Sequence, residues 1–210
     1  MRIVPAVLTD RLEQLRAILK TAEGFTDFVQ IDFMDGRFVP SNSVSPKDMH
    51  GIKTTLVCEA HLMVENPEQC LSDLRLFGFK RIIFHYEADC DPRSVIRGIR
   101  AHGIEVGMAL NPETDIAGVE DFISVLDSVL FLSVRPGFYG SPFIPSVLEK
   151  IREFRQLHSS IIIGIDGGVG LDNIMRVKSV GVDYACVGSR IFLSEDPSAS
   201  YRELREKAGG

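Results

Sequence analysis

The sequence has no run of basic residues, and its 23 lysines and arginines are outnumbered by 29 aspartates and glutamates. The formal net charge is -6 at pH 7. Nucleic acids and anionic membranes are bound through positively charged surfaces, so this charge argues against both as the main partner, although a local cationic pocket is compatible with it. We therefore expect neither nucleic acid nor a membrane as a partner.

Long apolar runs and paired cysteines are missing as well. No segment approaches the roughly 18 apolar residues that a membrane span needs, and the N-terminal MRIVPAVLTD turns polar too early for a secretory signal. The cysteines form no C-x-x-C pair, which favours buried reduced thiols over a disulfide or a zinc site. They are Cys58, Cys70, Cys90 and Cys186. These absences predict a cytoplasmic protein.

What the chain does have is a regular alternation of two patterns. Short β-type runs, eight in all, alternate with segments in which apolar residues recur at helical spacing, such as Leu12, Leu15 and Leu19. The β-type runs span residues 2–7, 28–33, 56–64, 81–86, 104–110, 128–134, 161–166 and 183–188. With 45% hydrophobic and 25% charged residues, the composition is that of a globular protein with ample material for a core.

This alternation predicts an α/β fold. Strands that read as nearly continuous apolar runs are those buried on both faces, which indicates parallel strands covered by helices. Eight strand and helix units without a linker or a break in composition favour a closed (β/α)8 TIM barrel, as a single domain over residues 1–210. A doubly wound open sheet is the alternative, because the number of units alone does not prove closure.

Polar residues stand at the ends of three of the expected strands. Asp32 ends the second, His61 lies near the end of the third and Asp166 ends the seventh. Each alone is most simply a capping aspartate or a core histidine. In a barrel, however, the carboxyl ends of all strands surround one pocket, so these three side chains are expected to converge there. An ionised carboxylate in a mostly apolar pocket needs a partner or a task.

Glycine-rich loops follow the last three expected strands. They are RPGFYGSPF, with Gly137 and Gly140, then IDGGVG, with Gly167 and Gly168, and VGSRIF, with Gly188 and Ser189. Glycine lets backbone N–H groups approach a ligand closely, so such loops can hold a phosphate group. One glycine pair would indicate only a turn, but three adjacent loops match the phosphate position that is common in barrels. A phosphorylated small molecule is therefore the expected partner.

Seven motifs in this order resemble those of the ribulose-phosphate 3-epimerase family, and the resemblance runs from Ile3 to Pro197. They are IDFMDGRFVP, EAHLMVENPE, FHYEA, GMALNPET, PGFYGSPFIP, IDGGV and VGSRIF. The resemblance implies a (β/α)8 barrel and an isomerase that inverts C3 of a ketose phosphate. The family interconverts D-ribulose 5-phosphate and D-xylulose 5-phosphate in the pentose phosphate pathway. Close relatives that epimerise other ketose phosphates share most of these motifs. The family also implies a homo-oligomer, such as a dimer or a hexamer.

The resemblance assigns the catalytic roles to Asp32 and Asp166. The family uses two aspartates on opposite faces of the substrate, because a single group would return the proton to the face from which it came. The enediolate intermediate must also be stabilised. In the family a divalent zinc, iron or manganese ion does this, held by two histidines and the same two aspartates. His61 and the two aspartates match that ligand set.

The resemblance also places a set of residues against the substrate and its phosphate. Two of them, Met34 and Met63, match methionines that line the family's cavity, although both could equally be core residues. The complete set is His61, Met34, Met63, Gly137, Phe138, Tyr139, Gly140, Gly167, Gly168, Gly188 and Ser189.

Four positions depart from the family pattern. Gln30 stands where the first metal-binding histidine would be, and an amide oxygen is a weaker, neutral ligand than imidazole. We therefore expect reduced metal affinity, and Gln30 is a doubtful ligand. Ala6 replaces a serine that contacts the substrate, Leu132 replaces a third methionine, and Tyr139 replaces a glycine of the phosphate loop.

Three hypotheses follow. An epimerase of ribulose 5-phosphate or of a similar ketose phosphate is favoured. Barrel relatives that decarboxylate or condense sugar phosphates resemble each other in an Asp-x-Lys-x-x-Asp motif, but Asp32-Phe33-Met34-Asp35 contains no lysine. A non-catalytic sugar-phosphate-binding protein is the third, and the retention of both Asp32 and Asp166 counts against it.

Overall fold

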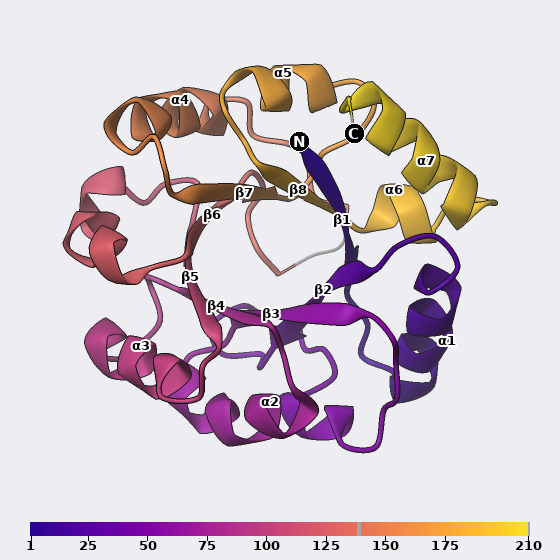
Figure 1. Ribbon diagram of the computed structural model, residues 1–210, viewed down its shortest axis with the longest axis horizontal. Helices are drawn as coiled ribbons and strands as arrows, with labels where there is room; N and C mark the ends of the chain where they lie inside the picture. The colour runs from indigo at the N-terminus through magenta and orange to yellow at the C-terminus, as the bar shows by residue number, and fades with distance from the viewer. Residues whose placement is uncertain (138–139, 210) are drawn as a thin grey trace.

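The computed structural model describes residues 1–137 and 140–209, and its eight parallel strands close into one barrel surrounded by helices (Figure 1). The strands follow each other around the barrel in chain order. They are β1 (Arg2–Val7), β2 (Phe28–Met34), β3 (Val57–Met63), β4 (Arg81–His85), β5 (Glu105–Leu110), β6 (Ser128–Leu132), β7 (Ile162–Asp166) and β8 (Tyr184–Val187). All eight expected strands are present.

Pairing of the first strand with the last closes the barrel. Residues Arg2 to Pro5 of β1 pair in parallel with Tyr184 to Val187 of β8. This pairing confirms the (β/α)8 barrel and rules out the open sheet. The strands are buried along almost their whole length, as in β1, where only Arg2 is exposed. Burial on both faces is the reason why the sequence of each strand is so continuously apolar.

Among the described residues, α-helices and three 3-10 helices lie in the segments that connect the strands or follow the last one. The α-helices are α1 (Leu12–Ala22), α2 (Leu71–Phe77), α3 (Pro92–Arg100), α4 (Val147–Leu157), α5 (Ile174–Ser179), α6 (Ser189–Phe192) and α7 (Pro197–Lys207). The 3-10 helices are η1 (Pro46–Met49), η2 (Pro67–Cys70) and η3 (Ile116–Val125). The connection between β5 and β6 is therefore made by η3 and not by an α-helix. Among the described residues, no helix has the length and apolar character to cross a membrane.

The alternation of side chains along β2 separates an outer core from the barrel interior. Ile31 and Phe33 are fully buried and belong to the core between strands and helices. Gln30 and Asp32 lie between them in sequence and therefore point to the opposite face, into the barrel. The interior also holds a small apolar cluster that includes Leu132. The alternation of side chains along β2 thus places two polar side chains inside the barrel.

The structure describes all four cysteines and records each as free. Cys58 and Cys186 are buried, as expected, whereas Cys70 and Cys90 are partly exposed. The expectation of free thiols is confirmed, but the expectation of burial is wrong for two of them. Cys70 lies where 3-10 helix η2 meets α2, and Cys90 lies in the loop before α3. Both positions are outside the barrel wall.

Candidate active site

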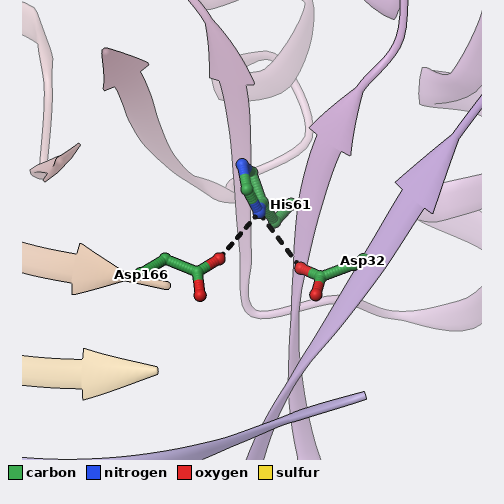
Figure 2. Close-up of side chains that lie close together, drawn as sticks. All are labelled: Asp32, His61 and Asp166. Atoms are coloured by element: carbon green, nitrogen blue, oxygen red, sulfur yellow. Dashed lines mark hydrogen bonds and ion pairs between the residues drawn. The ribbon is translucent and has the colours of Figure 1, made fainter. Parts of the chain in front are cut away.

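Three of the predicted site residues converge at one end of the barrel (Figure 2). Asp32 and His61 are paired neighbours on β2 and β3, and Asp166 is the last residue of β7. The three side chains offer ligand atoms that all lie within 4.8 Å of one another. His61 is fully buried, and Asp32 is 6% exposed. The prediction that these residues meet is confirmed.

One nitrogen of His61 faces both carboxylates. His61 Nδ1 lies 3.0 Å from Asp32 Oδ1 and 3.3 Å from Asp166 Oδ2. The same two oxygens accept hydrogen bonds from Gln30 Nε2, at 2.8 Å and 2.9 Å. The second oxygen of each carboxylate points away from His61 (Figure 2). Each aspartate thus has one oxygen held by protein donors and one directed elsewhere.

Burial and like charge shape the protonation of this group. Burial raises the pKa of Asp32, and the negative charge of Asp166 raises it further, against hydrogen bonds from His61 and Gln30. Burial alone would lower the pKa of His61. Hydrogen bonds and attraction from the two carboxylates outweigh this and raise its pKa to about 9. His61 as a cation offsets one of the two negative charges beside it.

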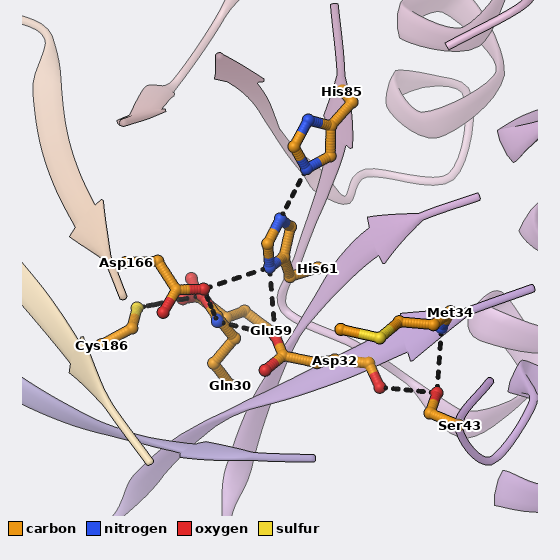
Figure 3. A network of polar contacts seen from close by, with 9 residues as sticks. All are labelled: Gln30, Asp32, Met34, Ser43, Glu59, His61, His85, Asp166 and Cys186. Carbon is orange, nitrogen blue, oxygen red and sulfur yellow. Dashed lines mark hydrogen bonds and ion pairs between the residues drawn. The ribbon is translucent and has the colours of Figure 1, made fainter. Parts of the chain in front are cut away.

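A chain of polar contacts extends from His61 away from the carboxylates (Figure 3). His61 Nε2 lies 3.0 Å from His85 Nε2, and His85 Nδ1 lies 3.1 Å from Glu87 Oε2. Burial lowers the pKa of His85 to about 4, so this ring is neutral at pH 7. Its single proton goes to Nδ1, because Glu87 is an acceptor there. His85 Nε2 therefore accepts from His61 Nε2–H, which orients His61.

Glu87 is held in place by the segment after β5. Its Oε1 accepts hydrogen bonds from the backbone N–H of Asn111, at 2.8 Å, and from the hydroxyl of Thr114. In the sequence, His85 and Glu87 belong to the FHYEA motif. The structure shows that they form a continuous chain to the carboxylate pair.

A second polar chain begins at the side-chain oxygen of Gln30 and the thiol of Cys186 (Figure 3). The thiol of Cys186 donates to Gln30 Oε1 at 3.0 Å and lies 4.0 Å from Glu59 Oε1. Burial raises the pKa of Cys186 well above its usual value, so the thiol keeps its proton. Glu59 in turn accepts from Arg81 Nη1 at 3.2 Å. Sequence reasoning treated Cys186 as an ordinary buried thiol and missed its contact with the site.

A cavity of about 270 Å³ opens beside the two aspartates. Nearly all of the predicted substrate-contacting residues that the structure describes line it. These are Met34, Met63, Gly137, Gly140, Gly167, Gly168, Gly188 and Ser189. His61 is not among the lining residues, because it lies buried behind the aspartates. Phe138 and Tyr139 lie outside the described residues, so their predicted contacts stay predictions.

The loop after β7 has a shape that only glycine supports. Gly167 has a φ of 108° and Gly168 a φ of 64°, both in the left-handed region. A Cβ atom on Gly167 would lie 2.4 Å from Val134 Cγ2, and one on Gly168 would lie 3.0 Å from the Phe143 backbone. The two glycines thus let this loop pack against the loop after β6 while its backbone borders the cavity.

Two charged residues that the sequence analysis did not single out also line the cavity. Arg190 follows Ser189 directly, and Asp172 lies on the loop before α5. Sequence reasoning assigned the phosphate to backbone groups alone and so passed over Arg190 in the VGSRIF motif. Its position next to a predicted phosphate loop was the available signal.

The donor set fits a divalent metal ion in three of four positions. An imidazole nitrogen and two carboxylate oxygens are ligands that zinc, iron and manganese all accept. Gln30, the fourth candidate, turns its Nε2–H groups and not its oxygen toward the carboxylates.

Asp35, the aspartate just after β2, stabilises the local backbone. Its carboxylate accepts hydrogen bonds from the backbone N–H groups of Arg37, Phe38 and Glu65.

Comparison with known proteins gives matches over nearly the whole chain. The model of the ribulose-phosphate 3 epimerase family matches residues 2–192. Ribulose-phosphate 3-epimerase of Mycobacterium tuberculosis (strain ATCC 25618 / H37Rv) is 33% identical over 213 residues, which cover 99% of this chain and 93% of that protein. Ribulose-phosphate 3-epimerase of Bacillus subtilis (strain 168) is 30% identical, with 98% of each chain covered.

Among solved structures, similar barrels occur in enzymes whose names differ from that of the family above. 3-Hexulose-6-phosphate synthase from Salmonella typhimurium superposes with a TM-score of 0.72 at 16% identity, covering 99% of this chain and 98% of that one. Orotidine 5'-phosphate decarboxylase from Pyrococcus horikoshii OT3 gives 0.68 at 16% identity, with 99% of both chains covered. At such low identity these matches support the fold alone.

Proposed function

The chain belongs to the ribulose-phosphate 3 epimerase family, and from this we propose that it interconverts D-ribulose 5-phosphate and D-xylulose 5-phosphate. Family membership supports an epimerase of the isomerase class. The observation that carries the finer proposal is the pair of carboxylates, Asp32 and Asp166, held together by His61 at the edge of a cavity that glycine loops border. A reaction that moves a proton from one face of a carbon to the other needs such a pair.

In the proposed reaction, one aspartate removes the proton from C3 and the electron pair moves into the adjacent carbonyl group, which gives an enediolate. The other aspartate then gives a proton to C3 from the opposite face, and the carbonyl group re-forms. Before each turnover, one carboxyl group must therefore be ionised and the other protonated. Burial and the negative charge of Asp166 raise the pKa of Asp32, which favours a proton on that carboxyl group.

The protein donors restrict which carboxylate oxygens react. Gln30 and His61 bind the inner oxygen of each aspartate, Asp32 Oδ1 and Asp166 Oδ2. The outer oxygens, which point away from His61, are therefore the ones that transfer protons. A divalent ion held by Asp32, His61 and Asp166 would supply positive charge that stabilises the enediolate. His61 itself, buried behind the aspartates, sets their positions.

The glycine loops provide the proposed phosphate site. Gly137, Gly167 and Gly188 line the same cavity as the aspartates, and the backbone N–H groups of their loops are the proposed phosphate donors. Arg190 adds a positively charged side chain at its rim. A ketose phosphate bound here would place its phosphate at the loops and its carbon chain over the carboxylates.

Two other readings are less well supported. Barrel relatives that decarboxylate or condense sugar phosphates share an Asp-x-Lys-x-x-Asp motif. In β2 the position of its lysine is taken by Met34, which argues against these reactions. A protein that only binds a sugar phosphate would have little use for two opposed carboxylates. An epimerase acting on a different ketose phosphate shares every feature of the site and is distinguished only by assay.

The direct test is turnover in deuterium oxide. Purified protein is treated with a chelator and incubated with D-ribulose 5-phosphate, with and without zinc, iron(II) or manganese, and the products are followed by proton NMR. We expect D-xylulose 5-phosphate with deuterium at C3, because each inversion exchanges that proton. A protein that binds the sugar phosphate but shows neither product nor exchange under any metal condition would contradict the proposal.

A further inference from the structure

The side-chain amide of Gln30 is held from both ends. Its Nε2 donates to Asp32 Oδ1 and Asp166 Oδ2, and its Oε1 accepts from the thiol of Cys186 (Figure 3). We propose that Cys186 is a positioning residue that fixes Gln30 as a hydrogen-bond donor to the carboxylate pair and so keeps its oxygen from serving as a metal ligand. The catalytic use of this pair rests on the proposed function, but the orientation of the amide does not.

Burial makes this orientation the only well-satisfied one. Gln30 is fully buried and Cys186 is 1% exposed, so each polar atom needs a partner from the protein. If the amide were reversed, its Oε1 would face Asp32 Oδ1 and Asp166 Oδ2, which are acceptors like itself. The reversed Nε2 would then face the sulfur atom of Cys186, which is a weak acceptor. The observed orientation satisfies both hydrogens and the oxygen.

The three contacts come from three different strands, which gives the amide little freedom. Gln30 and Asp32 lie on β2, Asp166 ends β7, and Cys186 lies on β8 beside Asp166 in the strand register. Gln30 lies 136 residues from Asp166 and 156 from Cys186 in sequence. The barrel walls thus fix all the groups that hold the amide, and its rotation would have to break three hydrogen bonds together.

This arrangement changes how the site receives a cation. An ion between Asp32, His61 and Asp166 competes with the donors that now occupy Asp32 Oδ1 and Asp166 Oδ2. Gln30 becomes a fourth ligand only after its amide turns over, which breaks the contact from Cys186. The thiol therefore opposes metal binding, although it is not a ligand itself.

The test measures metal affinity in two variants that change the thiol in opposite senses. Mn²⁺ binding to chelator-treated protein is measured by electron paramagnetic resonance, because this ion prefers oxygen ligands to thiols. Cys186→Ala removes the donor, and we expect binding that is about threefold to tenfold tighter, the equivalent of one net hydrogen bond. Cys186→Ser supplies a stronger donor of similar size, and we expect binding that is weaker than in the unchanged protein.

The matched control is Cys58→Ala, which removes a second buried thiol from the outer core, where it donates to the Leu56 carbonyl at 3.6 Å. It is expected to leave Mn²⁺ affinity unchanged. A further control is Cys186→Ala in a Gln30→Leu background, where no amide is left to release. There the alanine substitution is expected to have no effect on affinity. Equal shifts in the alanine and serine variants, or a persistent effect without Gln30, would overturn the proposal.

A measurement on the unchanged protein covers the case in which the Cys186 variants fail to fold. With ¹⁵N-labelled glutamine side chains, the metal-free protein is expected to show one NH₂ pair with slow hydrogen exchange, assigned to Gln30 through its loss in Gln30→Leu. A rapidly exchanging Gln30 amide would contradict the fixed orientation. None of these measurements requires turnover, so an inactive protein with the expected metal affinities would contradict only the proposed function.

Discussion

The two sides of the cavity are built from different parts of the chain. The carboxylate side consists of side chains on β2, β3 and β7, buried in Asp32 and His61 and partly exposed in Asp166, and these three residues depend on one another for charge balance. The loop side consists of backbone after β6, β7 and β8, shaped by glycines in the left-handed region such as Gly167 and Gly168. The first side depends on which functional groups are present, whereas the second depends on the backbone conformation.

This difference divides the expected effects of substitution. Changes on the carboxylate side should lower kcat, because they alter proton transfer. Changes on the loop side should raise KM or lower stability, because they alter how the phosphate is held. Substitutions that lowered kcat from the loop side would break this division.

Asp166→Asn should have the largest effect. The amide cannot take up the C3 proton, so we expect kcat to fall by about 10³-fold or more, with sugar-phosphate binding changed only a few-fold. Steady-state kinetics and calorimetric binding measure the two quantities separately. Asp172→Asn is the matched control, because Asp172 lines the same cavity but lies outside the carboxylate group. An equal fall in kcat in the two variants would contradict the assignment of Asp166 as an acid or base.

Glu87→Gln should have the next largest effect, through the tautomer of His85. The backbone N–H of Asn111 requires an acceptor at one atom of this side chain, so the NH₂ group of a glutamine would face His85 Nδ1. His85 would then carry its proton on Nε2, against the Nε2–H of His61. We expect kcat to fall about 10-fold to 100-fold, the usual effect of losing a residue that orients a site histidine.

The control for this variant is Glu65→Gln. Within the described part of the chain, the side chain of Glu65 makes only an exposed ion pair with Arg37, at 3.5 Å. The substitution should leave kcat within about twofold, as is usual for surface pairs. NMR of the histidine ring nitrogens measures the tautomers directly. Unchanged tautomers of His61 and His85 in Glu87→Gln would contradict the orienting role.

The sequence allowed the barrel and the main polar residues of the site to be predicted, because both follow from local patterns. Asp32 and Asp166 stand at strand ends, and closure of the barrel brings such ends together. The role of Cys186 could not be found in this way. Its contact with Gln30 depends on the registers of β8 against β1 and of β1 against β2, and on the length of the glutamine side chain, none of which a local pattern contains.

On the loop side, Gly168→Ala should reduce stability and ligand affinity without lowering kcat. A left-handed φ of 64° costs alanine about 1–2 kcal/mol, and the new Cβ would press on the Phe143 backbone at 3.0 Å. Gly51→Ala is the matched control, since Gly51 also has a positive φ but nothing within 4 Å of the added Cβ. Thermal unfolding should show a larger loss for Gly168→Ala, and only this variant should raise KM. Equal behaviour of the two variants would mean that contact with Phe143 does not shape the cavity.

Arg190→Ala should have the smallest effect of the four and is the sharpest test of what the loop side does. The side chain is exposed and lines the cavity rim, where water and salt screen its charge, so its contact with a phosphate is worth about 1 kcal/mol. We expect KM to rise about fivefold with kcat unchanged, and the difference from the unchanged protein to shrink as salt is added. Arg202→Ala, on the exposed face of α7, should change neither constant. A fall in kcat with constant KM in Arg190→Ala would place this residue with the carboxylates functionally, and the division between the two sides of the cavity would no longer hold.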